Sequence, residues 1–454
     1  MFRTHLNNIK YCSFAASKTD NYLMTTITKS ETKDKTNSNN KLSKPSDVEI
    51  MAPVGSYESL MAAIQGGANS VYFGIGNLNM RSKSSKNFTL DDLIKISNIC
   101  KENNIRTYIT LNTVIYDSEL GTMRDIVDAA KQNEITAIIA SDQSVIQYAH
   151  KVGMEIHMST QTNITNIEAV KYYSQFADVM VTARELEIKQ VKAITTAISE
   201  QNICGPSGEL VQIEVFAHGA LCMAVSGKCY LSLDNLNSSA NRGACLQQCR
   251  RKYTVTDKET GEQLEIDNEY IMSPKDLNTV ALLDYLLDAG VRVLKLEGRG
   301  RSPEYVKTIA SVYREAVDAW FVGEYTQKNI DKWNERLSTV YNRGFWDGYY
   351  MGSKFGEWTE DYGNQATQRK MYIGKVTNFF NKIGVAEIKI ESHDLVVGDE
   401  VKIIGETTGV YEDTISEVRL DLDPVDKVIK GEVCSVKVRN TVRRGDKLYK
   451  VVKN

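Results

Sequence analysis

Short apolar runs alternate with longer amphipathic stretches over most of the chain. The stretches between the first runs, such as SLMAAIQGGA and MRDIVDAAKQN, have helical periodicity and end near Gly or Asn, as helix C-caps prefer. Strands that alternate with helices predict parallel pairing with right-handed crossovers. Eight runs close a TIM-like (β/α)₈ barrel, with an open doubly wound sheet as the alternative. The runs lie at 49–55, 70–75, 106–112, 137–141, 155–160, 177–183, 213–219 and 292–298.

The regular spacing breaks once, between the seventh and the eighth run. About seventy residues separate these two runs, and the excess contains four cysteines and the stretch 252–272. That stretch predicts a β-hairpin that turns at Glu259–Gly261. Insertions that follow a strand of such a barrel lie on its catalytic face. We therefore expect an insertion at about 220–275 that holds the cysteines over the barrel mouth.

The carboxy-terminal part has a different pattern, made of strand-like runs alone. Six short runs follow one another after Met371, with Gly-Asp turns at 398–399 and 445–446. This pattern predicts a small closed β-barrel over 371–454, joined by a polar linker at 356–370 to a catalytic barrel at 48–355. The last residues are basic, which fits either a solvated edge strand or an RNA-contacting surface.

The amino-terminal part is polar and lacks a continuous apolar segment. Residues 25–47 are rich in Lys, Ser, Thr and Asn and are almost devoid of large hydrophobic side chains. Such a segment buries too little apolar surface to offset its ordering entropy. We expect a disordered extension over 1–47 and a fold that begins near Val48. Residues 1–24 do not form a secretory signal, so we expect a cytoplasmic protein, with an organellar transit peptide as the alternative.

Composition narrows the class of protein without naming a function. Hydrophobic residues make up 42% and charged residues 25%, which excludes wholesale disorder. The 55 basic residues nearly balance the 58 acidic ones, for a net charge of −3, which excludes a histone-like polycation but not a local basic groove. No run of about 18 apolar residues occurs, so we expect no membrane-spanning helix.

Four of the eight cysteines form one cluster, in the order C-x₆-C-x₁₅-C-x₃-C. Four thiolates can close a tetrahedral zinc site or hold an iron–sulfur cluster, and the spacing alone leaves both open. Disulfides and buried unreactive thiols are the other possibilities, although a reducing compartment favours metal. The cluster cysteines are Cys222, Cys229, Cys245 and Cys249. Asn241-Arg242-Gly243 and the basic run Arg250-Arg251-Lys252 flank the last two and predict cations beside thiolates or phosphate contacts.

Polar residues at the carboxyl ends of barrel strands are typical of active sites. Lys295 and Glu297 alternate with leucines in the eighth run, so both can point into the barrel, as a structural ion pair or as functional groups. We expect Arg299 or Arg81 to bind a substrate carboxylate, and Glu297 or His218 to transfer a proton. His218 can equally support the cysteine loop. Other candidates at strand ends are Asn112, Asp142, Gln161, Arg184 and Glu185.

The segment EVFAHGALCMAVSGKCYLS at 214–232 resembles the signature of peptidase family U-32, the collagenase-like peptidases. The pieces APVGSYESLMAAIQGGANSVYFG, NRGACLQQCR, MSPKDL and LKLEGRGRSPEYV are also similar to that family. The likeness covers 48–454 and is strongest to its tRNA hydroxylation protein P group. The terminal β-barrel is similar to the second domain of translation elongation factors.

The resemblance implies an activity. Members of the group are implicated in oxygen-independent 5-hydroxylation of the wobble uridine of tRNA, dependent on prephenate and an iron–sulfur cluster. It implies a [4Fe–4S] cluster on the four cluster cysteines, prephenate as co-substrate and the tRNA anticodon arm as partner, with the electron donor open. Relatives imply ribosomal RNA or a quinone precursor as alternative substrates.

Two other classes of function stay open beside RNA hydroxylation. A peptidase needs an activated nucleophile. Because neither an H-E-x-x-H nor a G-x-S-x-G motif occurs, Cys222 with His218 is the one candidate pair of nucleophile and base. A non-catalytic module that binds the cluster for assembly is the other class. For the hydroxylase, we expect the barrel mouth to receive an unstacked pyrimidine.

Overall fold

The computed structural model describes residues 42–83, 87–251, 253–261, 263–264, 272–352, 357–359 and 363–454. Its first part is a closed parallel barrel, because β11 pairs with both β1 and β7. This closure confirms the predicted TIM-like barrel and excludes the open sheet. The barrel strands are β1 (Glu49–Pro53), β2 (Ser70–Gly74), β3 (Arg106–Leu111), β4 (Ala137–Ala140), β5 (Glu155–Met158), β6 (Val179–Val181), β7 (Gln212–Ala220) and β11 (Val293–Leu296).

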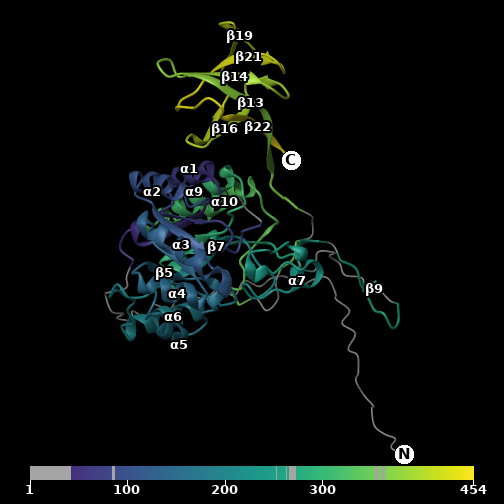
Figure 1. Ribbon diagram of the computed structural model, residues 1–454. Helices are drawn as coiled ribbons and strands as arrows, with labels where there is room; N and C mark the ends of the chain where they lie inside the picture. The colour runs from purple at the N-terminus through teal and green to yellow at the C-terminus, as the bar shows by residue number, and fades with distance from the viewer. Residues whose placement is uncertain are drawn as a thin grey trace, which may run out of the picture. The chain divides into compact units, whose positions relative to one another are not determined.

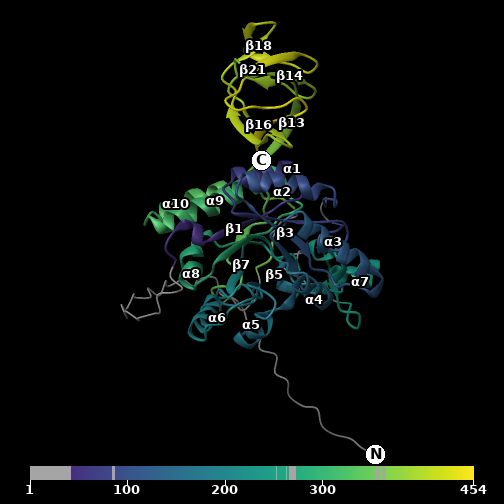
Figure 2. The ribbon, with the colours of Figure 1, turned by 60° about the vertical axis from the view of Figure 1, so that its left-hand side comes forward.

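Helices surround the strands, as Figure 2 shows. Side-chain caps fix several of their starts: Ser56 accepts a hydrogen bond from the Ser59 amide, and Asp142 accepts one from the Ser144 amide. No helix in the described ranges is long and apolar enough to span a bilayer. The helices are α1 (Tyr57–Gln65), α2 (Asp92–Glu102), α3 (Leu120–Gln132), α4 (Gln143–Lys151), α5 (Ile167–Tyr173), α6 (Ile188–Glu200), α8 (Leu283–Asp288), α9 (Pro303–Phe321) and α10 (Gln327–Ser338).

The segment between β7 and β11 forms the predicted insertion, which we call the cap (residues 221–275). It contains α7 (Leu231–Leu236), two short 3₁₀ turns and a hairpin of β8 (Val255–Thr256) and β9 (Gln263–Leu264). The expected turn at 259–261 is therefore confirmed, while residues 252, 262 and 265–271 of the same stretch lie outside the described residues. Beyond the cap, β10 (Asp276–Asn278) pairs antiparallel with β7 and parallel with β12 (Phe345–Trp346).

The carboxy-terminal part has the expected antiparallel strands over their own apolar core, but the described ladders form a sheet that does not close into the predicted barrel. The predicted turns at Gly398 and Gly445 have positive φ, which glycine adopts without strain. In the described ladders β17 and β19 are edge strands. All six predicted runs contain strands, and four further strands appear. The strands, seen in Figure 1, are β13 (Gln368–Phe380), β14 (Val385–Ile390), β15 (Leu395–Val396), β16 (Glu400–Gly405), β17 (Gly409–Thr414), β18 (Val418–Leu420), β19 (Asp423–Val425), β20 (Lys427–Val428), β21 (Val433–Lys437) and β22 (Lys447–Lys453).

Two predicted boundaries need adjustment. Residues 1–41 of the expected extension lie outside the described residues, but Pro45–Asp47 form a 3₁₀ turn, so regular structure begins before Val48. The Asp47 carboxylate accepts hydrogen bonds from the backbone amides of Ser43 and Lys44, which explains the order there. Of the expected linker, 356 and 360–362 lie outside the described residues, and β13 begins within it at Gln368.

Candidate active site

A cavity of about 370 Å³ lies at the carboxyl ends of the barrel strands. Its wall combines the barrel mouth with the cap, since Asn112 follows β3, Arg184 follows β6 and all four cluster cysteines belong to the cap. The insertion therefore holds the cysteines over the mouth, as its position after β7 predicts. A cavity of this volume accommodates a small ligand or a single base.

The four cluster cysteines share the cavity wall and are free thiols. Burial raises the pKa of Cys249, the Arg250 charge lowers it, and the thiols of the other three cysteines raise it further. In the described part of the chain no three His, Cys, Asp or Glu side chains are gathered at metal-binding spacing. The donor set suits a group that binds four thiolates, and its binding would require the cap segments to draw together.

The motif Asn241-Arg242-Gly243 docks the cap on the barrel rather than placing a cation beside the thiolates. Arg242 donates to both carboxylate oxygens of Glu119, at 2.6 and 2.5 Å, and stacks on Tyr116. Gly243 has φ +76°, and a Cβ there would lie 2.1 Å from the Asn79 carbonyl oxygen. Only glycine permits this close approach to the loop after β2.

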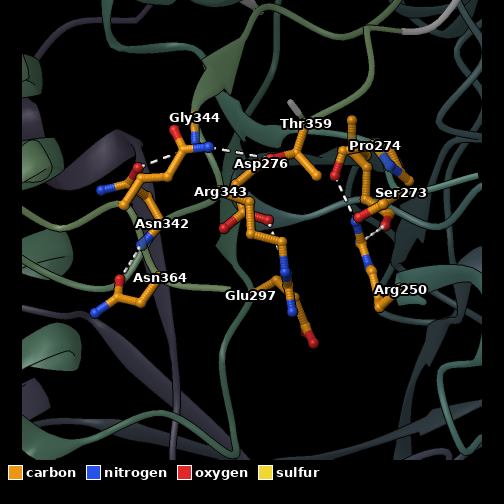
Figure 3. A network of polar contacts seen from close by, with 12 residues as sticks. Arg250, Ser273, Pro274, Asp276, Glu297, Asn342, Arg343, Gly344, Thr359 and Asn364 are labelled. Carbon is orange, nitrogen blue, oxygen red and sulfur yellow. Dashed lines mark hydrogen bonds and ion pairs between the residues drawn. The ribbon is translucent and has the colours of Figure 1, made fainter. Parts of the chain in front are cut away.

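Arg250 has a structural environment as well. Its guanidinium donates to the Leu221 carbonyl at 2.7 Å, to Ser273 Oγ at 3.0 Å and to the Pro274 carbonyl at 2.5 Å, contacts that Figure 3 shows in part. Nearby, Arg343 pairs with the buried Asp276 at 3.0 Å. The Arg250 contacts join the two ends of the cap to each other, so Arg250 positions Cys249.

Glu297 is held between two donors. Arg81 Nη2 lies 2.5 Å from Glu297 Oε1, and the Tyr72 hydroxyl donates to Oε2 at 2.9 Å. Burial raises the pKa of Glu297, but the charges of Arg81, Arg184 and Arg299 outweigh burial and lower it to about 2. A carboxylate with this pKa stays ionised at neutral pH and is a weak base, so its geometry favours anchoring Arg81 over transferring a proton.

Lys295 points into the barrel as predicted, but its partner is not Glu297. Its Nζ lies 2.6 Å from Glu214 Oε1, and both side chains are almost completely buried. The ammonium also lies 4.9 Å from the centre of the Tyr72 ring. Lys295 lines the cavity, so it can present a proton or a positive charge to a ligand.

The remaining predicted residues differ in how far their polar groups are already engaged by other protein groups. Arg299 is buried and donates to Thr110 Oγ1 at 3.0 Å and Asn79 Oδ1 at 2.9 Å, and burial lowers its pKa to about 10. Asn112 lines the cavity and donates to Ser159 and Gln161 at 3.3 Å each.

His218 is not brought to the cavity with the other predicted residues. Its ring is buried among Tyr305, Tyr313 and Phe345, and burial lowers its pKa to about 3. A neutral imidazole in an aromatic pocket is a support for the strand end, not a proton-transfer group at this cavity. No described histidine lines the cavity wall, so Cys222 has no imidazole partner there.

Two guanidiniums of the wall have no hydrogen-bonding or ionic partner among the described residues. Arg184 stacks on Phe216 at 3.8 Å with its Nε buried and unsatisfied, and Arg301 stacks on Tyr341 at 3.4 Å. Sequence position marked Arg184 as a mouth candidate but missed Arg301. The signal for Arg301 was the GRGR run directly after the eighth strand.

The cavity carries an excess of positive charge. Among the described residues seven cations line it, and three of them, Arg81, Lys295 and Arg343, are matched by the carboxylates of Glu297, Glu214 and Asp276. Four cations are left without a carboxylate, which favours an anionic ligand. The unmatched cations are Arg184, Arg250, Arg299 and Arg301.

The model of peptidase family U32 matches residues 55–360. The chain belongs to peptidase family U32. A protein named collagenase from Porphyromonas gingivalis (strain ATCC BAA-308 / W83) is 56% identical to this U32 chain over 404 residues, which are 89% of the chain and 98% of the relative.

Other U32 relatives carry names from RNA modification. The tRNA hydroxylation protein P1 of Bacillus subtilis (strain 168) is 28% identical over 378 residues, 82% of this chain and 86% of that protein. The 23S rRNA 5-hydroxycytidine C2501 synthase of Escherichia coli (strain K12) is 29% identical over 412 residues, 90% of this chain and 56% of that protein. The family thus supports an RNA hydroxylase-like enzyme, while its names alone leave the specific activity open.

Proposed function

We propose that this U32 protein is an RNA-modifying enzyme that hydroxylates C5 of the wobble uridine of tRNA by an oxygen-independent route. The observation that carries the proposal is the cavity wall, whose described residues include four thiols and four unmatched cations but no histidine. Relatives named as tRNA and rRNA hydroxylation proteins support the same chemistry. Ribosomal RNA and a quinone precursor are alternative substrates of this chemistry.

The rim of the cavity fits a single-stranded nucleic acid. Tyr230, between the wall residues Cys229 and Leu231, is 75% exposed. Lys228 and Arg251, which adjoin the wall residues Gly227 and Arg250 along the chain, are also exposed. An exposed ring can stack on a base, and cations can contact phosphates. In the proposal, the target pyrimidine leaves its stack to enter the cavity. The carboxy-terminal sheet and its basic end hold the anticodon arm.

The cluster cysteines are the proposed ligands of a [4Fe–4S] cluster, as four free thiols on one wall suit that group. When bound, the cluster would supply the electron-transfer chemistry that hydroxylation, an oxidation of the base, requires. Arg250 positions Cys249 through its three oxygen contacts.

Arg184 and Arg301 are the proposed receptors for the carboxylates of prephenate, the co-substrate. Both guanidiniums lie in the wall without a protein partner among the described residues, and aromatic rings hold them in place. A guanidinium binds a carboxylate through two parallel hydrogen bonds. Arg81 and Arg299, which the sequence suggested for this role, are engaged by Glu297 and by Thr110 and Asn79.

A collagenase-like peptidase is the second candidate, because a relative 56% identical to the chain bears that name. The wall geometry argues against it. Cys222 has no described histidine beside it in the cavity, and Glu297, the carboxylate found among the described wall residues, is bound to Arg81. A non-catalytic assembly module that binds the cluster would have the same cysteines. It would not need the unmatched arginines.

Mass spectrometry of tRNA nucleosides from a gene-deletion strain tests the proposal. We expect 5-hydroxyuridine-derived nucleosides to disappear on deletion and to return with the wild-type gene. Unchanged nucleosides would contradict the tRNA assignment. Loss of a 5-hydroxylated base from ribosomal RNA instead would favour the ribosomal alternative, and cleavage of denatured collagen by the purified protein would favour the peptidase.

A further inference from the structure

Four ionisable side chains form a row inside the barrel, behind the cavity wall. Glu155 and His157 belong to β5, Glu214 to β7 and Lys295 to β11. The side chains of His157 and Glu214 are completely buried, and that of Lys295 is 7% exposed. Barrels of this kind are normally filled with branched apolar residues. Burying a carboxylate, an imidazole and an ammonium in their place is unfavourable unless the groups have a task.

The contacts along the row join one end of the barrel to the other. Glu155 Oε1 lies 3.1 Å from His157 Nε2, His157 Nδ1 lies 3.6 Å from Glu214 Oε2, and Glu214 Oε1 accepts from Lys295 at 2.6 Å. Glu155 begins β5 at the amino end of the barrel, and its side chain is 34% exposed. Lys295 lines the cavity at the carboxyl end. The row therefore runs from solvent to the cavity.

The middle contact is poised to form a hydrogen bond. His157 Nδ1 and Glu214 Oε2 are both buried and lack a hydrogen-bond partner in the described residues, and they face one another. A shift of a few tenths of an ångström would join them. Burial lowers the pKa of His157, but Glu155 and Glu214 together raise it above its ordinary value.

One further titratable group packs on His157. The Tyr108 ring of β3 lies 4.5 Å from the imidazole, centre to centre, and its hydroxyl donates to Glu49 at 2.8 Å. Glu49 also pairs with Arg106. This second network starts at the same end of the barrel, and among the described residues it meets His157 through the Tyr108 ring.

We propose that Glu155, His157, Glu214 and Lys295 form a proton path that supplies the cavity from solvent at the amino end of the barrel. The inference rests on the proposed function only in taking the cavity as the site of reaction. Lys295 is the group that gives a proton to the bound ligand: an N–H bond of its ammonium breaks as the proton passes to a ligand oxygen or nitrogen that gains negative charge.

The path then returns to its starting state. The neutral Lys295 amine takes a proton from Glu214, whose carboxyl turns after receiving that proton from His157 Nδ1. His157 starts with one ring proton, on Nδ1. As that proton leaves, Nε2 takes a proton from Glu155, which takes one from water, and a turn of the ring then presents the new N–H to Glu214. One proton has moved from solvent to the ligand, and no oxidant or reductant is consumed.

Exchange of the His157 ring N–H with water tests the path without any substrate. The full-length chain has five histidines, so isotope-labelled imidazoles give few NMR signals. His218 is the internal control, since it is equally buried but lies among aromatic rings and its Nδ1 has no hydrogen-bond partner among the described residues. We expect the His157 ring proton to exchange at least about tenfold faster than that of His218 at neutral pH.

Two variants make the test specific. Glu155→Gln removes the proton acceptor at the solvent end and is expected to slow His157 exchange about tenfold. Glu49→Gln removes a paired carboxylate at the same end of the barrel and is expected to leave His157 exchange unchanged. A purely structural network would loosen on losing Glu155 and exchange faster.

The proposal is overturned if His157 exchanges as slowly as His218, or if Glu155→Gln leaves the rate unchanged or raises it. If Glu155→Gln does not fold, the comparison of His157 with His218 in the wild-type chain still decides. Because no RNA is present, these results do not depend on whether tRNA is the substrate. A failed nucleoside test with fast His157 exchange would therefore refute the proposed function and not the path.

Discussion

Arg184 and Arg301 differ from the other cations of the cavity in having no oxygen partner in the described part of the protein. We expect Arg184→Gln or Arg301→Gln to weaken prephenate binding about tenfold or more, because a charge-assisted hydrogen bond contributes about 1.5–3 kcal/mol. Lysine at either position should restore part of the affinity, since it cannot bind both carboxylate oxygens. Isothermal titration of the full-length protein measures the change.

Arg336→Gln is the matched control for these arginine variants. Arg336 lies on α10, pairs with Glu315 and is not in the cavity wall. Wild-type affinity for prephenate in Arg184→Gln and Arg301→Gln would remove both residues from the receptor role.

Glu297 gives a prediction for stability against pH. The pKa of Glu297 is about 2 in the folded chain, below its ordinary value. The ionised side chain therefore stabilises the fold fully at pH values above the ordinary pKa, and this stabilisation is lost as the pH falls through about 2. Glu297→Gln should lower the free energy of unfolding by about 3 kcal/mol at pH 7, because Arg81 loses its buried partner. The difference from wild type should persist to about pH 5 and shrink below about pH 4.

Urea unfolding across this pH range measures the effect. Glu134→Gln, which breaks an exposed pair with Lys101, should leave stability unchanged. A Glu297→Gln variant as stable as wild type at pH 7 would mean that the Arg81 contact adds nothing.

At the residue scale, the sequence predicted most of the side chains that reach the mouth but not which of them pair. His218, Asp142 and Glu185 were also predicted there and do not line the cavity. Alternation with leucines was enough to turn Lys295 and Glu297 inward. Their partners, Glu214 and Arg81, come from β7 and from the loop after β2, and no local pattern specifies such contacts. The aromatic pocket of His218 depends in the same way on α9 and β12.

The cap is the element that carries the proposed chemistry. Anaerobically isolated protein should contain about four irons per chain, and Cys222→Ser or Cys245→Ser should lose most of them. Cys204→Ser is the control, because Cys204 lies outside the cap and the cavity wall. Zinc in place of iron in the wild-type protein would contradict the proposed cluster.

Tyr230 tests the rim of the same element. Tyr230→Ala should weaken tRNA binding about tenfold, because stacking contributes about 1–3 kcal/mol per base, while Tyr230→Phe should bind like wild type. Tyr285, on α8, is 51% exposed and supplies the control variant Tyr285→Ala. Filter binding at fixed salt measures both, and an equal loss for the two alanine variants would refute a specific rim contact.

At the element scale, periodicity and turn residues were sufficient for most of the fold. The eight barrel strands, the cap hairpin and the six terminal runs were all predicted. β17 was missed, because GVYEDT combines a starting glycine with two acids and has little strand propensity by itself. The antiparallel pairing with β16 stabilises β17 as a strand.

The whole molecule combines a near-neutral chain with a cationic cavity. The net charge of the chain therefore does not predict the proposed anionic ligand. The excess of cations exists because barrel loops and cap, separate in sequence, meet at one mouth. Membership of peptidase family U32 was predictable from the cap signature, whereas the choice between peptidase and hydroxylase depends on which groups line that mouth.

The most direct test of the account is the wobble-nucleoside content of tRNA in a deletion strain complemented with single-residue variants. Wild type and Cys204→Ser should restore 5-hydroxyuridine-derived nucleosides, and Cys222→Ser and Arg301→Gln should not, at equal protein levels. Restoration by Cys222→Ser would contradict the role of the cysteine wall. An unaltered nucleoside profile in the deletion strain itself would contradict tRNA hydroxylation by this protein.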